Sequence, residues 1–134
     1  MLEGHRVLFP YKAYECQKDY MRRVIEAASR QQNALLESPT GTGKTLSLLC
    51  SALAWLSKQK ELEKKNFPLT PAKIIYLTRT HSQITQVIRE LKKTAYNPSV
   101  SILGSRDVLC VNPYVNKEKG RDFKCLMLKK QRQW

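Results

Sequence analysis

The sequence has no apolar run long enough to cross a membrane, and its first residues lack the apolar core of a secretory signal peptide. We therefore expect an intracellular chain that has no membrane partner. In a reducing compartment, cysteines are thiols or metal ligands rather than disulfides. We expect the same of the four cysteines here, Cys16, Cys50, Cys110 and Cys125.

Acidic residues are scarce. The chain has 11 Asp and Glu against 24 Lys and Arg, which gives a formal net charge of +13. Such an excess of positive charge predicts a polyanionic partner, and nucleic acid is the first choice. A basic surface that only keeps the protein in solution is the alternative. Basic residues concentrate in residues 117–132, but no compact cluster forms a nuclear import signal.

A total of 134 residues with 42% hydrophobic content is enough for one globular domain with a real core. Apolar residues at helical spacing predict helices over 15–29, 46–56 and 82–93, the last with Ser82 as its N-cap. Short apolar or β-branched runs predict strands over 33–37, 72–78 and 99–103. Strands that alternate with helices indicate an α/β fold with a parallel sheet and crossover helices.

Between the first strand and the next helix lies a loop suited to phosphate. It consists of Ser38, Pro39, Thr40, Gly41, Thr42, Gly43, Lys44 and Thr45. The glycines let backbone N–H groups turn toward an anion, Lys44 can reach the β- and γ-phosphates, and the Thr45 hydroxyl can bind Mg²⁺. The helix N-terminus adds a positive dipole to the same place. The alternative is a glycine-rich turn that binds no ligand.

Polar residues follow the second and third predicted strands. The first group includes Arg79, Thr80, His81 and Ser82, and the second includes Arg106. Ligands of open α/β sheets bind at the carboxyl ends of the strands, so these side chains are candidates for contacts with a phosphodiester backbone. An ordinary polar helix cap explains the first group equally well.

The cysteines alone are weak evidence for a metal site. Cys110 follows the third strand and Cys125 lies in a basic stretch, and two unrelated thiols remain the simpler interpretation. A structural zinc site or an iron–sulfur cluster normally has four ligands. Cys16 lies on the first predicted helix, and Cys50 lies among core positions of the second. Neither is well placed to complete a site.

From about residue 7 onward, the chain resembles the N-terminal part of the XPD-type superfamily 2 iron–sulfur DNA helicases. The segments that carry the resemblance are 9–17, 37–45, 78–87 and 103–110. They are similar to the adenine-side segment, motif I, motif Ia and the entry to the iron–sulfur domain of that family. The family's motif I also has a residue other than glycine at the position of Ser38.

The resemblance implies a RecA-like motor domain 1 in residues 1–104 and the beginning of an iron–sulfur domain in residues 105–134. It implies an ATP-dependent 5′→3′ DNA helicase of genome and telomere maintenance, located in the nucleus, that acts on single strands and duplex junctions. The implied cofactors are ATP, Mg²⁺ and a 4Fe-4S cluster. Gln17 would contact the base, Lys44 and Thr45 would serve ATP and Mg²⁺, and Cys110 and Cys125 would be cluster ligands.

Several parts of the family pattern are missing from these 134 residues. They lack two further cluster cysteines, the Asp-Glu-Ala-His motif and the second motor domain. We therefore expect a helicase fragment that is inactive alone and cannot complete a cluster. One alternative is a non-catalytic nucleic-acid-binding module with a vestigial phosphate loop. A small kinase or GTPase is disfavoured, because no Asp or Glu ends the 72–78 or 99–103 strands.

Overall fold

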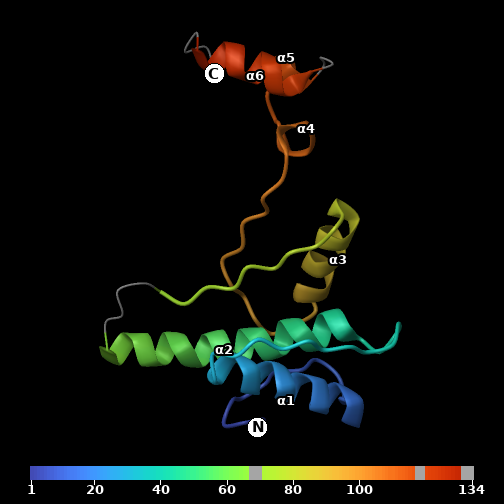
Figure 1. The fold of residues 1–134 in the computed structure, drawn as a ribbon, viewed down its shortest axis with the longest axis vertical. Helices are drawn as coiled ribbons and strands as arrows, with labels where there is room; N and C mark the ends of the chain where they lie inside the picture. Colours follow the sequence, from blue (N-terminus) through green and yellow to red (C-terminus); the bar gives the residue numbers. More distant parts are fainter. Residues whose placement is uncertain (67–70, 117–119, 131–134) are drawn as a thin grey trace. The chain divides into compact units, whose positions relative to one another are not determined.

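The computed structural model describes residues 1–66, 71–116 and 120–130, and the chain divides into two compact units, Met1–Pro98 and Ser99–Trp134 (Figure 1). The first unit holds α1 (Glu15–Ser29), α2 (Lys44–Asn66) and α3 (His81–Leu91). The second holds α4 (Arg106–Leu109), α5 (Pro113–Asn116) and α6 (Arg121–Lys130). The predicted domain boundary after residue 104 stays a prediction.

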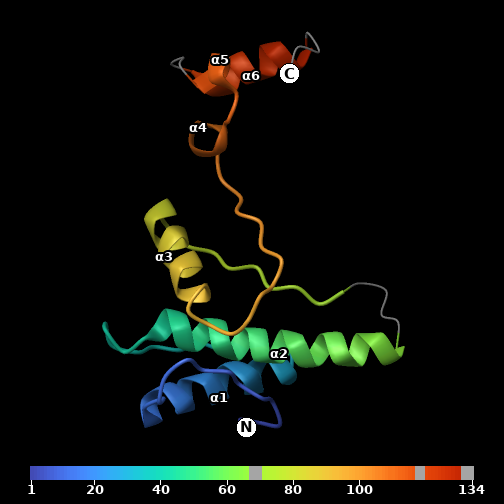
Figure 2. The ribbon, with the colours of Figure 1, turned by 180° about the vertical axis from the view of Figure 1, so that it is seen from behind.

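The core of the first unit lies where α1 packs along α2, which both views show (Figures 1 and 2). Met21 and Ile25 are four residues apart on α1, so they lie on one face of the helix, and both are buried. Cys50 of α2 is fully buried and packs with Met21. Burial of a large apolar side chain stabilises the fold by about 1.5–3 kcal/mol. The predicted helix over 15–29 is confirmed, and so is the core position of Cys50.

The end of α1 is fixed by backbone hydrogen bonds. The N–H of Gln31 donates to the carbonyl of Ala28 (3.3 Å), and the N–H of Gln32 donates to that of Ala27 (2.9 Å). Gln31 itself has a φ of 55°. This is the Schellman arrangement, in which the residue after the helix takes a left-handed conformation and the last carbonyls gain partners.

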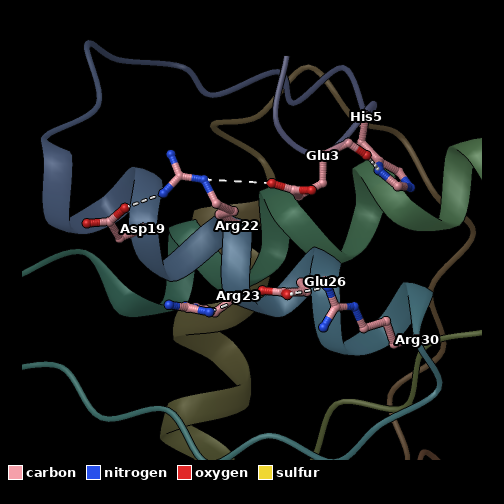
Figure 3. Close-up of polar contacts among 7 residues, drawn as sticks. All are labelled: Glu3, His5, Asp19, Arg22, Arg23, Glu26 and Arg30. Carbon is pink, nitrogen blue, oxygen red and sulfur yellow. Dashed lines mark hydrogen bonds and ion pairs between the residues drawn. The ribbon is translucent and has the colours of Figure 1, made fainter.

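A tight turn ties the N-terminus to both helices. The imidazole Nδ1 of the buried His5 donates to the carbonyl of Glu3 at 2.7 Å. The Glu3 carboxylate lies 3.9 Å from Arg22 of α1, and Arg22 also pairs with Asp19 at 2.5 Å (Figure 3). From α2, Lys58 donates to the carbonyl of Gly4 at 3.2 Å. The chain before α1 is therefore held against the helix pair.

The predicted α/β, RecA-like parallel sheet is wrong. Among the described residues there is no β-ladder, and the only β-type pairing is an isolated bridge between Leu2 and His5. The predicted strands over 33–37, 72–78 and 99–103 contain no strand residue. β-branched runs suit extended backbone, but a strand forms only when a neighbour accepts and donates its ladder hydrogen bonds. A helix makes these bonds within itself, so the helices form and the sheet does not.

The predicted strand segments accordingly leave apolar side chains in solvent. Leu35 is fully exposed, Ile75 is 76% exposed and Leu77 is 84% exposed. A packed sheet would cover one face of each strand. The described part of the chain is thus a helical structure with extended connections, and no described helix is long and apolar enough to span a membrane.

In the second unit, short helices are held by side chains. The carboxamide oxygen of Asn112 accepts from the N–H groups of Tyr114 (2.9 Å) and Val115 (3.2 Å) at the start of α5, and Val115 is buried. Arg106 of α4 pairs with Asp122 of α6 at 3.3 Å. The basic C-terminal stretch expected from sequence forms α6 in part, and residues 117–119 and 131–134 lie outside the described residues.

Candidate nucleotide-binding site

The loop before α2 has the backbone that its glycines allow. Gly41 and Gly43 have φ angles of +82° and +75°, which favour glycine because a side chain would clash in this region. The carbonyl of Gly43 accepts from the N–H of Ser47 at 3.0 Å, so Gly43 caps the helix with no side chain of its own. The first amides of α2 therefore follow directly on the loop.

Hydroxyl groups brace the loop from within. Thr42 Oγ1 donates to the carbonyl of Pro39 at 2.8 Å and lies 2.5 Å from Ser38 Oγ. Since the single Thr42 hydroxyl proton points to Pro39, Ser38 is the donor in the second contact. Ser38, which stands where the strict phosphate-loop pattern has glycine, thus fixes the shape of the loop.

The Lys44 side chain turns back into the loop. Its ammonium donates to the carbonyl of Ser38 and, at 3.2 Å, to that of Pro39. No acidic residue lies in the first turn of α2 to neutralise the dipole of the helix. The charge of Lys44 and the N-terminus of α2 therefore combine at one place, which is what an anion site requires.

Gln17 of α1 connects that helix to the loop. Its side-chain nitrogen donates to the carbonyl of Thr42 at 3.0 Å, and its side-chain oxygen accepts from the N–H of Tyr14 at 3.0 Å. Sequence reasoning gave Gln17 a contact with a base, which stays a prediction. Both polar ends of its carboxamide are engaged within the protein.

A cavity of about 500 Å³ lies beside the loop. Its lining residues come from the start of α2, the segment before α3, and α3 itself: Thr45, Tyr76, Leu77, Thr78, Arg79, Gln83, Gln86 and Val87. The structure thus brings together Thr45 and Arg79, two residues predicted from separate motifs. None of the lining residues is a carboxylate, so any Mg²⁺ at Thr45 would find no acidic partner among them.

Three further predicted DNA-contacting residues, Thr80, His81 and Ser82, lie at the start of α3. Thr80 is the N-cap, and its hydroxyl accepts from the N–H of Gln83 (3.4 Å) while Gln83 accepts from the N–H of Thr80 (3.3 Å). The prediction of Ser82 as N-cap is wrong, because the N-cap is Thr80, two residues earlier. The Ser82 hydroxyl lies 3.0 Å from that of Thr80. His81 is exposed.

This reciprocal arrangement is a capping box, and its sequence signature is Thr or Ser followed three residues later by Gln or Glu. Thr80 and Gln83 carry that signature, so the sequence contained the information that sequence reasoning missed. No comparable sequence signal indicated that Tyr76 and Gln86 line the cavity, because this depends on how the extended segment before α3 passes the N-terminus of α2.

The residues present do not fit an iron–sulfur cluster. Burial raises the pKa of the Cys50 thiol to about 11, which disfavours the thiolate that a metal needs. Cys16 is exposed on α1, and Cys110 and Cys125 are half-buried in the second unit. Among the described side chains, no three His, Cys, Asp or Glu gather closely enough to hold a metal ion. Arg106, a predicted phosphate contact, is ion-paired with Asp122.

Comparisons with known proteins give one consistent set of relatives. Residues 76–134 match the DEAD_2 family. Regulator of telomere elongation helicase 1 of Mus musculus is 41% identical over 162 aligned positions, which cover 98% of this chain and 14% of that protein. The Homo sapiens protein is 40% identical and covers 98% of this chain and 13% of its own length.

A plant homolog from Arabidopsis thaliana is 43% identical over 142 positions, which cover 90% of this chain and 14% of the relative. The chain therefore spans a small fraction of the length of the curated relatives that it matches. Because 162 aligned positions exceed the 134 residues here, the Mus musculus relative carries additional residues inside the aligned region. No solved structure matches the chain.

Proposed function

Because this chain belongs to the family of the regulator of telomere elongation helicases, we propose that it is the nucleotide- and DNA-binding N-terminal part of an ATP-dependent 5′→3′ DNA helicase. The resemblance to XPD-type helicases drawn from the motifs is confirmed by this kinship. The observation that carries the proposal is the phosphate loop. It leads into the N-terminus of α2, whose first turn has no acidic residue, and it lies beside a cavity lined by Thr45 and Arg79.

The loop residues fit the triphosphate of ATP. Positive φ at Gly41 and Gly43 lets backbone amides of the loop turn toward a phosphate, and Lys44 and the start of α2 supply positive charge. Thr45 offers a hydroxyl to Mg²⁺ from the wall of the cavity. ATP and Mg²⁺, when bound, would supply the free energy of hydrolysis that moves a helicase along its strand.

Arg79 is the residue best placed to hold a DNA phosphate. It is exposed, it lines the cavity, and it forms no ion pair with any residue that the structure describes. The formal charge of +13 attracts a polyanion to the whole chain. A role at telomeres is part of the proposal and rests on the names of the relatives, and a location in the nucleus is proposed with it.

Binding to a labelled oligothymidine across a range of salt concentrations tests the DNA part. We expect the affinity to fall as salt rises, because bound cationic side chains release counterions. Arg79→Ala should weaken binding by about 3- to 10-fold and lower the salt slope by about 1, since one phosphate contact is lost. Arg89→Ala, a change in the last turn of α3, is the matched control. Affinity that does not depend on salt would contradict phosphate contacts.

A non-catalytic nucleic-acid-binding module is the second candidate. The observation in its favour is that no carboxylate lines the cavity at Thr45. Titration of ATP·Mg²⁺ against the chain separates the two candidates. Micromolar or tighter ATP binding that Lys44→Ala weakens by at least about 10-fold supports the helicase site, whereas intact DNA binding with no ATP binding supports the module.

A further inference from the structure

We propose that Gln17 is a positioning residue that locks one peptide of the phosphate loop, the peptide between Thr42 and Gly43, in the orientation that binds anions. This inference rests on the proposed nucleotide site and adds a role for a residue outside the loop. It differs from a contact with the base, because it acts on the loop whether or not the ligand has a base.

The orientation of the Gln17 carboxamide follows from its neighbours. The N–H of Tyr14 can only donate, so the atom 3.0 Å from it is the side-chain oxygen. The carbonyl of Thr42 can only accept, so the atom 3.0 Å from it is the side-chain nitrogen. Gln17 therefore caps α1 with one end and holds the loop with the other.

Holding the Thr42 carbonyl also fixes an amide. In a planar trans peptide the C=O and the following N–H point in opposite directions. With the Thr42 carbonyl directed at Gln17, the N–H of Gly43 is directed away from Gln17. If this peptide rotated by half a turn, a carbonyl oxygen would take the place of the N–H and repel a phosphate.

The loop needs such a lock because its backbone is permissive. Gly41 and Gly43 both have positive φ, and glycine passes between backbone conformations at little cost. Ser38 and Pro39 brace the Thr42 side chain, but their contacts leave the Thr42 carbonyl unrestrained. The contact from Gln17 is the one described hydrogen bond to that carbonyl from outside the loop.

The space at Gly43 supports the same conclusion. A Cβ built on Gly43 would lie 2.8 Å from the Gln17 side-chain nitrogen, closer than real Cβ contacts allow. A Cβ on Gly41 would meet nothing within 4 Å. Gly43 is therefore small where Gln17 must approach, and the two residues form a matched pair that joins α1 to the loop.

Three variants of the 134-residue chain test the lock. Gln17→Glu keeps an oxygen that accepts from Tyr14 but cannot donate to the Thr42 carbonyl. Gln17→Met removes both hydrogen bonds without adding charge. Gln59→Glu is the charge control, because it adds the same charge on α2 outside the loop and outside the lining of the cavity. The ligands are ATP and inorganic tripolyphosphate, each with Mg²⁺, measured by calorimetry.

We expect both Gln17 variants to weaken the binding of ATP and of tripolyphosphate by the same factor, about 5- to 20-fold, and Gln59→Glu to have a smaller effect. In the ligand-free chain, the NMR signal of the Gly43 amide should broaden in the Gln17 variants, because the peptide exchanges between two orientations. Loss of affinity for ATP alone would assign Gln17 to the base and overturn the lock.

Unchanged affinities together with an unchanged Gly43 signal would also overturn it. If the wild-type chain binds neither ligand, the proposed nucleotide site fails, and the Gly43 signal alone decides the lock. Broadening in both Gln17 variants then supports the lock, and its absence refutes it.

Discussion

Threonine and a basic residue stand at the N-termini of both α2 and α3, but the two helices are capped differently. α3 begins at Thr80, whose side chain and that of Gln83 satisfy backbone N–H groups of the helix. α2 begins after Gly43, which has no side chain to offer. A helix that caps itself uses the amides that a ligand would need, whereas a glycine cap leaves them available.

This difference between the caps bears on the role of the polar residues at the start of α3. The hydroxyls of Thr80 and Ser82 lie 3.0 Å apart, and that of Thr80 accepts from the N–H of Gln83. Their contacts with a phosphate stay predictions. Arg79 precedes the cap and is exposed, and His81 in the first turn of α3 is exposed as well. Polar residues at the start of a helix therefore do not by themselves indicate an anion site, because a capping box accounts for them as well.

Removal of the Lys44 charge at the N-terminus of α2 should have the largest effect, which is on the affinity for ATP·Mg²⁺. Lys44→Ala is expected to weaken ATP·Mg²⁺ binding by about 10- to 100-fold, because a hydrogen bond to a charged group contributes about 1.5–3 kcal/mol. The measurement is calorimetric titration of the 134-residue chain. Lys92→Ala, which removes an exposed lysine at the C-cap of α3, is the control and should leave ATP affinity unchanged. Equal affinities of wild type and Lys44→Ala would show that the N-terminus of α2 does not bind phosphate.

The glycine cap gives the next largest effect. Gly43→Ala should lower the free energy of unfolding by more than about 1–2 kcal/mol, the cost of a side chain in left-handed backbone, because its Cβ also displaces Gln17. Gly41→Ala carries only the backbone cost, since its Cβ meets nothing within 4 Å. Chemical denaturation of the two variants measures the difference. Equal losses would mean that Gln17 moves aside freely.

The two helix starts also show what sequence could predict. The helices over 15–29 and 82–93 were found because the periodicity of a helix is local and its hydrogen bonds lie within one segment. The sheet was wrongly predicted because a strand depends on partners elsewhere in the chain. The exposed side chains of Ile75 and Leu77 lie in a segment with strong β-character that forms no ladder.

In the candidate site, too, features set by a local motif were predicted and features set by distant residues were not. Lys44, Thr45 and the loop glycines were identified from a contiguous motif, and the structure places them at the start of α2. The contact between Gln17 and Thr42 joins residues 25 positions apart, so no local pattern could indicate it. The shared cavity of Thr45 and Arg79 depends on tertiary packing in the same way.

The smallest expected effect concerns the N-terminus of α3, which is capped by its own side chains. Thr80→Ala removes the hydroxyl that accepts from the Gln83 N–H and should lower the free energy of unfolding by about 1 kcal/mol. Amide hydrogen exchange in the first turn of α3 should accelerate, while ATP affinity stays unchanged because α2 keeps its own start. Ser82→Ala is the matched control, since Ser82 contacts the cap without accepting from the helix backbone. If Thr80→Ala leaves exchange in α3 unchanged but lowers DNA affinity as much as Arg79→Ala does, then Thr80 binds phosphate rather than the helix. In that case the N-termini of both α2 and α3 would bind phosphate.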